Sequence, residues 1–558
     1  MDFRNKVIYQ IYPKSFYDSD HDGIGDLRGI IEKIPYIVKL NVNMIWFNPF
    51  FVSPQKDNGY DVADYRAVDP RLGTMEDFEE LVAKLKAHQI DVMLDMVFNH
   101  TSTKHEWFQK ALNGSKKYQD YYIIKEPKPN GGLPTNWTSK FGGPAWEKFG
   151  STDRYYLHLY DKSQADLNWR NPEVRNELYS IINFWMTKGV KGFRFDVINV
   201  TGKDARLVDA KPGEESKSLY TDKPVVHDYL QEMNRESFGK AADTVTVGEM
   251  SSTSIENSVG YTNPDNHELT MVFSFHHLKV DYQNGEKWTK TKFDFMKLKR
   301  ILDNWQSGMA KGNGWNALFW NNHDQPRAIN RFGDPGEYRV KSAQMLATVI
   351  HLLRGTPYIY MGEEIGMTDP DYHGIGDYDD IEAINAYHAL LKKGLSENEA
   401  FDIVHAKARD NSRTPMQWAD KENAGFSSHQ PWLKPTNYRQ INVEKELNEG
   451  SIFNYYQKLI QLRKNDPIVS HGGYESLLMD HPDVFAYFRT YQNQKLLVLN
   501  NFFKRNTAVT VPDQYLSLDS RVLISNYDRQ TFEKSIILKP YEAIAFLLID
   551  RESGEQHV

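Results

Sequence analysis

Asp196, Glu249 and Asp324 each lie at or next to the end of a short apolar, strand-like stretch of the sequence. A charged side chain at the tip of a buried strand is unfavourable, so three such tips suggest a site rather than a core. Two carboxylates on opposite sides of a bond, with a third nearby, are the groups that cleave a sugar acetal. These residues therefore predict glycosidase chemistry.

The immediate neighbours suggest different roles for the first two carboxylates. Arg194 lies two residues before Asp196, on the same side of an extended strand, and its charge favours an ionised aspartate. Glu249 stands between apolar Val247 and Met250 with no cation beside it in the sequence, which favours the protonated carboxyl group. We therefore expect an ionised nucleophile at Asp196 and a proton donor at Glu249.

An acidic loop near the N-terminus carries carboxylates at alternate positions. Its candidate metal ligands are Asp18, Asp20, Asp22, the backbone carbonyl of Ile24, and Asp26. Alternating carboxylates followed by a glycine resemble an EF-hand loop, although Gly29 stands where such a loop has a glutamate. The pattern predicts either a hard-cation site or a solvated acidic turn.

Eight apolar, strand-like runs alternate with amphipathic stretches and must position these residues. The runs are 7–12, 44–47, 92–97, 192–195, 244–247, 269–273, 317–320 and 358–361. Eight strands separated by helices are typical of a closed parallel (β/α)8 barrel, which keeps its chemistry at the carboxyl ends of the strands. An open doubly wound sheet would alternate in the same way, but the count of eight and the lack of a Gly-rich phosphate turn favour the barrel.

Two of the intervening helices have clear boundaries. Thr74 is followed three residues later by Asp77, the spacing of a capping box. The second helix has Asn171 as its cap, Pro172 in its first turn and Gly189 at its end. Both segments carry a stripe of apolar residues, so we expect each helix to pack one face on the barrel.

The domain organisation follows from where this alternation stops. Residues 101–170 contain glycines and aromatics but no clear helix beyond a short start, which predicts an inserted subdomain. From residue 472 the pattern changes to strict alternation, which predicts an antiparallel β domain over 472–558. The catalytic barrel is then expected in two parts, 1–100 and 171–471.

The composition excludes several classes of function. The 558 residues carry a net charge of −8 without a long basic block, which argues against nucleic acid and anionic membranes as partners. There is no cysteine, and no run is apolar enough to span a bilayer. The aromatic content of 13% is a mild indication of sugar binding. We expect a cytoplasmic protein. Its oligomeric state is left open, and a monomer is compatible with the sequence.

Four blocks of the sequence, in order and at strand ends, resemble those of glycoside hydrolase family 13, the α-amylase family. They are 95–100, 192–196, 248–250 and 322–324. The resemblance covers essentially the whole chain. It implies that Asp196 is the nucleophile, that Glu249 is the general acid/base, and that Asp324 binds sugar hydroxyl groups, with Arg194 beside the nucleophile.

The resemblance also implies a subsite for the glucose that is cleaved. His100 and His323 would donate to its hydroxyl groups, and Asp57 and Tyr60 would bind the non-reducing end and stack on the ring. Arg409 matches a family arginine that pairs with the equivalent of Asp57 and closes the pocket. A closed pocket would make the enzyme exo-acting, so that it takes one terminal glucose.

Within the family, Gln164–Asn168 and Val197 are similar to the oligo-1,6-glucosidase subgroup. Membership of that subgroup implies a structural Ca²⁺ or Mg²⁺ in the acidic loop. Such an ion would stabilise the protein and take no part in catalysis. The resemblance implies no organic cofactor.

The segment that follows the sixth run departs from the neutral-sugar members, because bases stand where those members tend to have acids. This change at a substrate-facing loop predicts an anionic small-molecule substrate, most simply a sugar phosphate. The candidate phosphate ligands are His276, His277, Lys279 and Lys287, with Lys203 and Lys292 as weaker candidates.

Together with residues 134–143 and 248–253, this segment is similar to the phosphotrehalase branch of the family. That resemblance implies a retaining α-glucosidase that splits α,α-trehalose 6-phosphate into glucose and glucose 6-phosphate through a covalent glucosyl-enzyme. One alternative is an oligo-1,6-glucosidase or sucrose-acting relative that takes neutral oligosaccharides. Another is a catalytically inactive binding module with the same fold. Release of glucose 6-phosphate distinguishes the three.

Overall fold

The computed structural model describes residues 2–550 and contains the predicted barrel. Eight strands close in chain order, and the parallel partners pair in register. The strands are β1 (Ile8–Ile11), β2 (Met44–Phe47), β5 (Asp91–Met96), β11 (Gly192–Phe195), β12 (Val245–Glu249), β13 (Met271–Phe273), β14 (Asn316–Leu318) and β15 (Thr356–Tyr360). Each strand overlaps a predicted run, with boundaries shifted by up to two residues, so the apolar patterning was sufficient to find every barrel strand.

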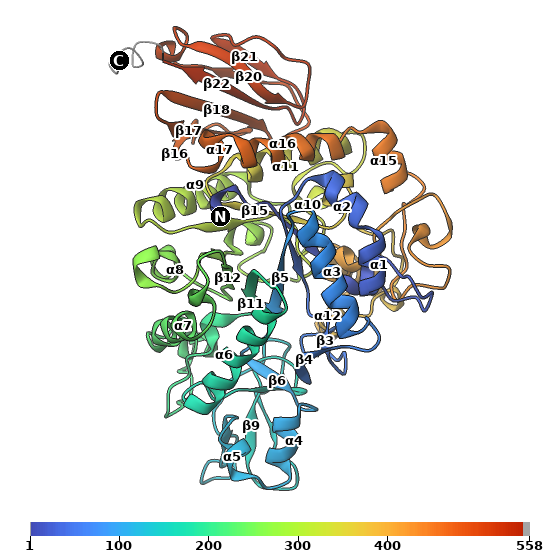
Figure 1. Ribbon diagram of the computed structural model, residues 1–558, viewed down its shortest axis with the longest axis vertical. Coiled ribbons are helices and arrows are strands. Elements are labelled where there is room, and N and C mark those ends of the chain that lie inside the picture. Colours follow the sequence, from blue (N-terminus) through green and yellow to red (C-terminus); the bar gives the residue numbers. More distant parts are fainter. Residues whose placement is uncertain (1, 551–558) are drawn as a thin grey trace. The chain divides into compact units, whose positions relative to one another are not determined.

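The contacts of the described chain define two compact units, one of which is Trp46–Phe275 with Gly312–Gly314. In this unit the helices α3 (Met75–Ala87) and α6 (Pro172–Thr187) begin as predicted. Thr74 and Asp77 form the capping box, and Asn171 caps α6. Trp185 of α6 is fully buried, because its ring packs against several aromatic side chains that include Phe78. In Figure 1, α3 lies beside β5, and α6 lies beside β11.

The same unit contains the segment that follows β5. Its elements are β6 (His100–Ser102), α4 (Glu106–Leu112), α5 (Lys116–Gln119), β7 (Ile124–Lys125), β8 (Trp146–Lys148), β9 (Tyr155–Leu157) and β10 (Gln164–Asp166). They form a three-stranded sheet, β7-β9-β8, and a two-stranded sheet, β10-β6. The two helices are of only one or two turns, which is too short for a periodic apolar stripe to reveal them.

The other unit contains the remaining described residues, among them the predicted antiparallel β domain. A five-stranded sheet has the order β16 (Gly473–Leu477), β17 (Val484–Tyr491), β18 (Gln494–Asn501), β22 (Ala543–Ile549) and β20 (Asp519–Ser525). A second, two-stranded sheet pairs β19 (Thr507–Thr510) with β21 (Ser535–Leu538). Alternate apolar side chains such as Phe488, Leu497 and Phe546 form the core of this domain.

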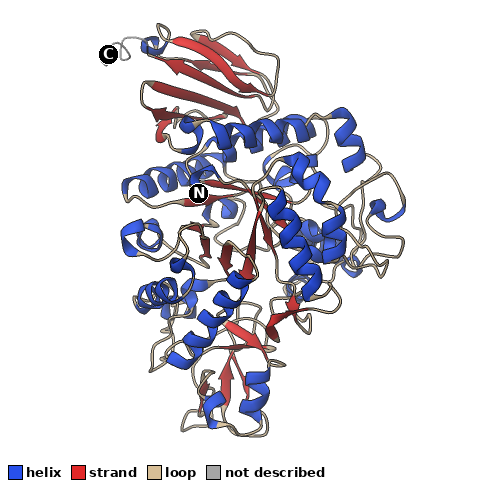
Figure 2. Ribbon diagram, viewed as in Figure 1, coloured by secondary structure: helices blue, strands red, loops and turns tan. Residues whose placement is uncertain are grey.

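Two helices lie beside this sheet within the same unit (Figure 2). The helix α11 (Arg339–Leu352) is buried without interruption from Ser342 to Leu352, as expected for a helix covered on all sides. It contacts α16 (Phe453–Asn465), the strands β18 and β22, and the barrel strand β15. The domain therefore rests on helices that also pack against the barrel. Among residues 2–550, no helix has both the length and the apolar composition needed to cross a bilayer.

Candidate active site

One guanidinium group forms ion pairs with three carboxylates at the ends of neighbouring strands. The register places Arg194 on β11 opposite Asp95 on β5 and Val247 on β12. Arg194 donates to Asp95 at 2.6 Å and to Asp196 at 2.9 Å, and it also donates to Glu249. Its side chain is 1% exposed, so these ion pairs are desolvated. The predicted nucleophile and proton donor are thus held by the same side chain.

This cluster has three carboxylates for one guanidinium group, and the pKa values of two of its acids are raised. Burial raises the pKa of Asp95 to about 6, although Arg194 lowers it. Burial also raises the pKa of Asp196 well above its ordinary value, with Glu249 and Asp95 adding to the effect and Arg194 opposing it.

Two expectations about this cluster were wrong. Glu249 does have an adjacent cation, because Arg194 reaches it from the neighbouring strand. Arg194 contacts Asp196 as expected, but the pKa of Asp196 is raised and not lowered, since burial and two further carboxylates outweigh one shared guanidinium. The raised pKa values of Asp95 and Asp196 therefore come from burial and from the neighbouring carboxylates.

The backbone turns sharply directly after Asp196. Val197 has a φ of 37°, a left-handed conformation that is uncommon for a β-branched residue. The chain then enters a short 3-10 helix, η3 (Ile198–Val200). The amide of Asp196 donates to the carbonyl oxygen of Met96 at 3.0 Å and so extends the barrel hydrogen bonding to the end of β11. The carboxylate is thereby fixed at the tip of the strand.

The structure brings together three of the residues predicted for the sugar subsite. The Nε2 of Gln164 donates to Asp57 at 3.0 Å and lies 3.1 Å from the Nε2 of His100. Tyr60 donates through its hydroxyl group to Asp95 at 2.9 Å, which connects this group to the cluster around Arg194. Burial lowers the pKa of His100 to about 4, so the ring is neutral and suited to hydrogen bonding with hydroxyl groups.

In the other unit, Asp324 lies among guanidinium groups. Arg413 donates to it at 2.8 Å and Arg409 at 3.4 Å, and the Nε2 of His323 lies 3.2 Å from its second oxygen. Two arginines favour the charged carboxylate. Arg409 also pairs with Asp380 at 2.5 Å. The predicted pairing of Arg409 with the aspartate at position 57 stays a prediction.

The predicted phosphate ligands do not form one group of available cations. The Nε2 of His277 lies 2.8 Å from the carbonyl oxygen of Phe319, and the ring is buried, so we assign this residue to packing and not to phosphate binding. Lys287 pairs with Glu382 at 2.8 Å, which already compensates its charge. The sequence could not indicate either contact, because both partners are distant along the chain.

The other predicted phosphate ligands, His276 and Lys279 and the weaker candidates Lys203 and Lys292, differ in their surroundings. His276 packs on Trp305 with ring centroids 5.1 Å apart, and burial, with Lys279 adding to it, lowers its pKa. Lys279 is half-buried at the end of the 3-10 helix η7 (His276–Lys279). Lys203 is buried and pairs with Asp166 at 2.7 Å, so it is not a phosphate ligand, whereas Lys292 is exposed.

One basic residue close to the catalytic cluster was missed. Lys140 donates to the hydroxyl group of Ser251, two residues after Glu249, and its ammonium group lies 5.8 Å from the ring centroid of Tyr160. Lys140 and Ser251 belong to residues 134–143 and 248–253, the two segments that resemble the family. Their contact joins residues far apart in the sequence, so no local pattern predicts it.

The acidic loop fits a hard cation. Ligand atoms of Asp18, Asp20 and Asp22 lie within 4.8 Å of one another. Partial burial and the neighbouring carboxylates Asp22, Asp26 and Asp18 raise the pKa of Asp20, a repulsion that a divalent ion would relieve. Asp26 is outside this group of three, because it caps the helix α1 (Leu27–Glu32) by accepting from the amide of Gly29 at 2.7 Å.

Comparison with known proteins agrees with this geometry. Residues 10–472 match the family described as alpha amylase, catalytic domain, and residues 484–545 match the alpha-amylase SusG C-terminal domain. The chain therefore belongs to the α-amylase family, and it is a glycoside hydrolase. The predicted family is confirmed.

Several named proteins are similar to this chain over nearly its whole length. The chain is 52% identical to a trehalose-6-phosphate hydrolase of Bacillus subtilis and 49% identical to one of Escherichia coli, with 98% of each chain covered in both cases. It is 46% identical to an oligo-1,6-glucosidase of Parageobacillus thermoglucosidasius, over 97% of this chain and 98% of that one. The crystal structure of trehalose-6-phosphate hydrolase from Bacillus licheniformis superimposes with a TM-score of 0.95 at 52% identity, over 98% of this chain and 100% of that one.

Proposed function

We propose that the protein hydrolyses α,α-trehalose 6-phosphate to glucose and glucose 6-phosphate, with retention of configuration. The observation that carries the chemistry is the shared guanidinium of Arg194, which holds Asp196 and Glu249 at the ends of adjacent strands. This arrangement supplies a nucleophile and a proton donor from one desolvated cluster, as a retaining glycosidase requires.

In the first step a carboxylate oxygen of Asp196 forms a bond to the anomeric carbon, and the bond to the bridging oxygen breaks. The proton of Glu249 passes to that oxygen, so glucose 6-phosphate leaves as an alcohol. In the second step Glu249 takes a proton from water, and the water oxygen displaces Asp196 and releases glucose.

We assign supporting roles to the surrounding residues. Asp324, kept ionised by Arg409 and Arg413, hydrogen-bonds the sugar hydroxyl groups, with His100, His323, Asp57 and Tyr60 completing the glucose subsite. In this proposal Arg409 closes the pocket against Asp57, so the enzyme is exo-acting. Asp18, Asp20 and Asp22 would hold a structural Ca²⁺ or Mg²⁺, which stabilises the loop and takes no part in the reaction.

Lys279 and Lys140 support a phosphorylated leaving group. Lys140 donates to Ser251 in the loop that follows the proton donor, and in this proposal it faces the leaving group. The relatives named above that act on trehalose 6-phosphate also favour this substrate. An ammonium group on a phosphate is a charge-assisted interaction, which neutral trehalose cannot make.

The test is a side-by-side kinetic comparison of trehalose 6-phosphate, trehalose and isomaltose, with release of glucose 6-phosphate measured enzymatically. We expect kcat/KM for the phosphate to exceed that for trehalose about a hundredfold or more, the effect of two charge-assisted hydrogen bonds. Proton NMR of the first glucose released should show the α-anomer. Equal rates on trehalose and its phosphate would contradict the proposal.

A second candidate has one specific observation in its favour. The 46% identity to an oligo-1,6-glucosidase is close to the values for the phosphate-cleaving relatives. If that identity reflects shared specificity, isomaltose is the best of the three substrates and the phosphate gives no advantage. The same assay therefore decides between the two candidates.

A further inference from the structure

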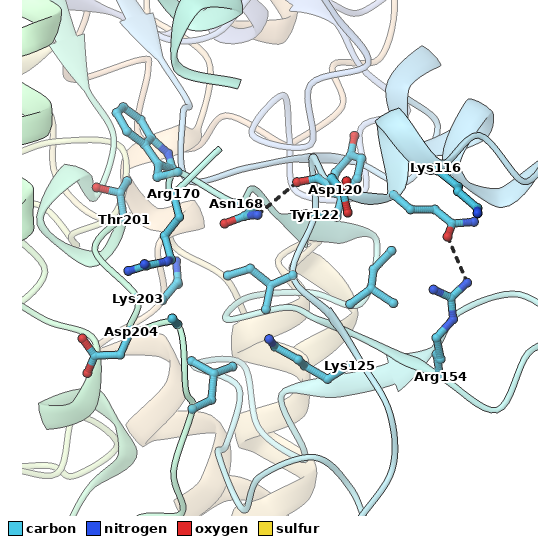
Figure 3. A pocket seen from close by; sticks show the side chains of 16 residues that line it. Lys116, Asp120, Tyr122, Lys125, Arg154, Asn168, Arg170, Thr201, Lys203 and Asp204 are labelled. Atoms are coloured by element: carbon cyan, nitrogen blue, oxygen red, sulfur yellow. Dashed lines mark hydrogen bonds between the residues drawn. The ribbon is translucent and has the colours of Figure 1, made fainter. Parts of the chain in front are cut away.

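A cavity of about 530 Å³ lies between the segment that follows β5 and the loop that follows η3 (Figure 3). None of Asp95, Arg194, Asp196 and Glu249 lines it. Its volume is in the range of pockets that hold small molecules. It is therefore a candidate binding site separate from the catalytic cluster.

Four cations line this pocket, and none of them is neutralised. Within residues 2–550, Lys116, Lys125, Arg154 and Arg170 form no ion pair with a carboxylate. Arg154 donates to the side-chain oxygen of Gln119 at 3.1 Å, a neutral partner that leaves its charge in place. Figure 3 shows Arg170 on one side of the pocket, Arg154 and Lys116 on the other, and Lys125 between them. The positive charge is thus spread around the cavity.

The other charged residues of the pocket do not offset these four. Lys203 pairs with Asp166 at 2.7 Å, and Asp204 lies 3.6 Å from Lys223. Asp120 is the one lining carboxylate, among the residues the structure describes, that has no cationic partner. A concave surface with this excess of positive charge concentrates anions.

The pocket also has groups that could bind the hydroxyl-bearing part of an anionic ligand. Asn168 donates its Nδ2 to the carbonyl oxygen of Asp120 at 3.0 Å, which leaves its side-chain oxygen available to a hydroxyl donor. Ile123 and Leu207 supply apolar wall. Arginine and lysine together favour phosphate, because the first offers paired donors and the second a compact charge.

We propose that this pocket binds a phosphorylated small molecule of the size of a hexose phosphate, at a place distinct from the catalytic centre. The phosphate lies against Lys125 and Arg170, and the sugar hydroxyl groups face Asn168. This inference goes beyond the proposed function and does not depend on which disaccharide the enzyme cleaves.

The test variant reverses two exposed charges, Lys125→Glu with Arg170→Glu. Lys203 is unsuitable, because it also donates to Asn99 at 2.6 Å, and the Asn99 amide lies 3.2 Å from His100 of the sugar subsite. The matched control is Lys162→Glu, an exposed lysine of the same segment that does not line the pocket. Melting temperatures of all three proteins show whether the fold is retained.

Isothermal titration of glucose 6-phosphate into the wild type should show a binding event that the double variant loses or weakens at least tenfold, while the control stays within twofold. Unchanged binding by the double variant would overturn the proposal. Inorganic phosphate, titrated in parallel, should bind more weakly than glucose 6-phosphate. Equal affinity would overturn the hexose phosphate as ligand.

A crystal structure of the wild type with glucose 6-phosphate provides a readout that needs no variant. Density for the phosphate within hydrogen-bond distance of Lys125 or Arg170 supports the proposal, and an empty pocket at saturating ligand contradicts it. The double variant should keep the wild-type kcat/KM for trehalose 6-phosphate. Failure of the proposed function would appear instead in the wild-type assay, as no release of glucose 6-phosphate.

Discussion

Two groups of carboxylates and arginines in this molecule share their ion pairs differently. Around Arg194, one guanidinium pairs with three carboxylates, those of Asp95, Asp196 and Glu249. Asp324 instead accepts from two guanidinium groups, although Arg409 also pairs with Asp380 and Arg413 lies 3.8 Å from Asp410. In the first group three acids share one cation, whereas in the second one acid contacts two cations that it shares with other acids.

The difference corresponds to what sugar cleavage asks of each group. A proton donor is available near neutral pH only where deprotonation is unfavourable, and burial together with excess negative charge makes it so. A carboxylate that only binds hydroxyl groups needs no proton and is best kept ionised. We therefore relate the two roles to how many guanidinium groups contact each acid, one for Asp196 and for Glu249 and two for Asp324.

The largest expected effect follows from removing the reacting groups of the first cluster. Asp196→Asn and Glu249→Gln should each lower kcat roughly 10⁴-fold, because neither amide can act as nucleophile or proton donor. Steady-state kinetics on trehalose 6-phosphate measures the loss. Asp153→Asn, at an exposed position, is the control and should behave as wild type. A tenth of the wild-type rate in either catalytic variant would refute these roles.

The next effect tests the charge balance itself. Arg194→Gln removes the one cation that three buried carboxylates share, so the raised pKa values of Asp95 and Asp196 should rise further. The acid limb of the kcat profile should then move to higher pH by about one unit or more. Arg413→Gln is the matched variant, because Arg409 still contacts Asp324, and its acid limb should stay in place. Identical shifts in the two profiles would show that arginine count does not set the protonation.

A third prediction concerns stability and depends on sign. The pKa of Asp95 is about 6 in the folded protein against an ordinary 3.8, so the folded state prefers the protonated acid. The free energy of unfolding therefore falls as the pH rises from about 4 to about 6. Above pH 6 the full loss attributable to Asp95 is present, roughly 2–3 kcal/mol. Asp95→Asn removes that loss.

Urea unfolding at pH 4 and at pH 7 measures this effect. The variant should gain stability relative to wild type as the pH rises through that interval, and it should be less active, because Arg194 loses an ionic partner. Asp153→Asn should show no such pH-dependent difference. A gain at pH 4 that disappears at pH 7 would have the opposite sign and would exclude a raised pKa.

A smaller effect is expected at the substrate phosphate. Lys279→Glu should raise KM for trehalose 6-phosphate about tenfold to a hundredfold, with KM for trehalose little changed, because one charged hydrogen bond becomes a repulsion. Lys297→Glu, on an exposed face of the following helix, is the control. Lys287→Met should have less effect, since Glu382 already neutralises that lysine. Unaltered kinetics in Lys279→Glu would remove this residue from the phosphate site.

The sequence was sufficient for those parts of the site that depend on local geometry. Arg194 and Asp196 are two residues apart on one strand, so alternation alone places both on the same side, and their contact was predicted. The barrel strands were found for the same reason, because their apolar character is continuous and local. Caps such as Thr74 and Asn171 are local as well.

The sequence could not predict contacts between residues on neighbouring strands or on distant segments. Arg194 reaches Glu249 because β11 and β12 pair with Arg194 opposite Val247, a register that the sequence of either strand does not state. Lys287 and Glu382 meet across 95 positions of the chain, and Lys140 meets Ser251 across 111. Each of these contacts changes the electrostatic surroundings of a site residue and leaves the fold as predicted.

The carboxylates of the acidic loop form a third group, which has no guanidinium partner among the described residues. Among residues 2–550, Asp18, Asp20 and Asp22 form no ion pair with lysine or arginine, and their ligand atoms lie within 4.8 Å of one another. Repulsion of this kind is relieved either by protons or by a divalent cation, and at neutral pH the cation is the stronger partner.

Calcium should therefore raise the melting temperature by a few degrees over the same protein in EDTA, with kcat at 25 °C unchanged. Differential scanning calorimetry measures the shift, and magnesium in parallel shows which ion is preferred. Asp20→Asn should abolish the response, whereas Asp153→Asn should keep it. If calcium and EDTA give the same melting temperature, the loop binds no stabilising cation and is a solvated acidic turn.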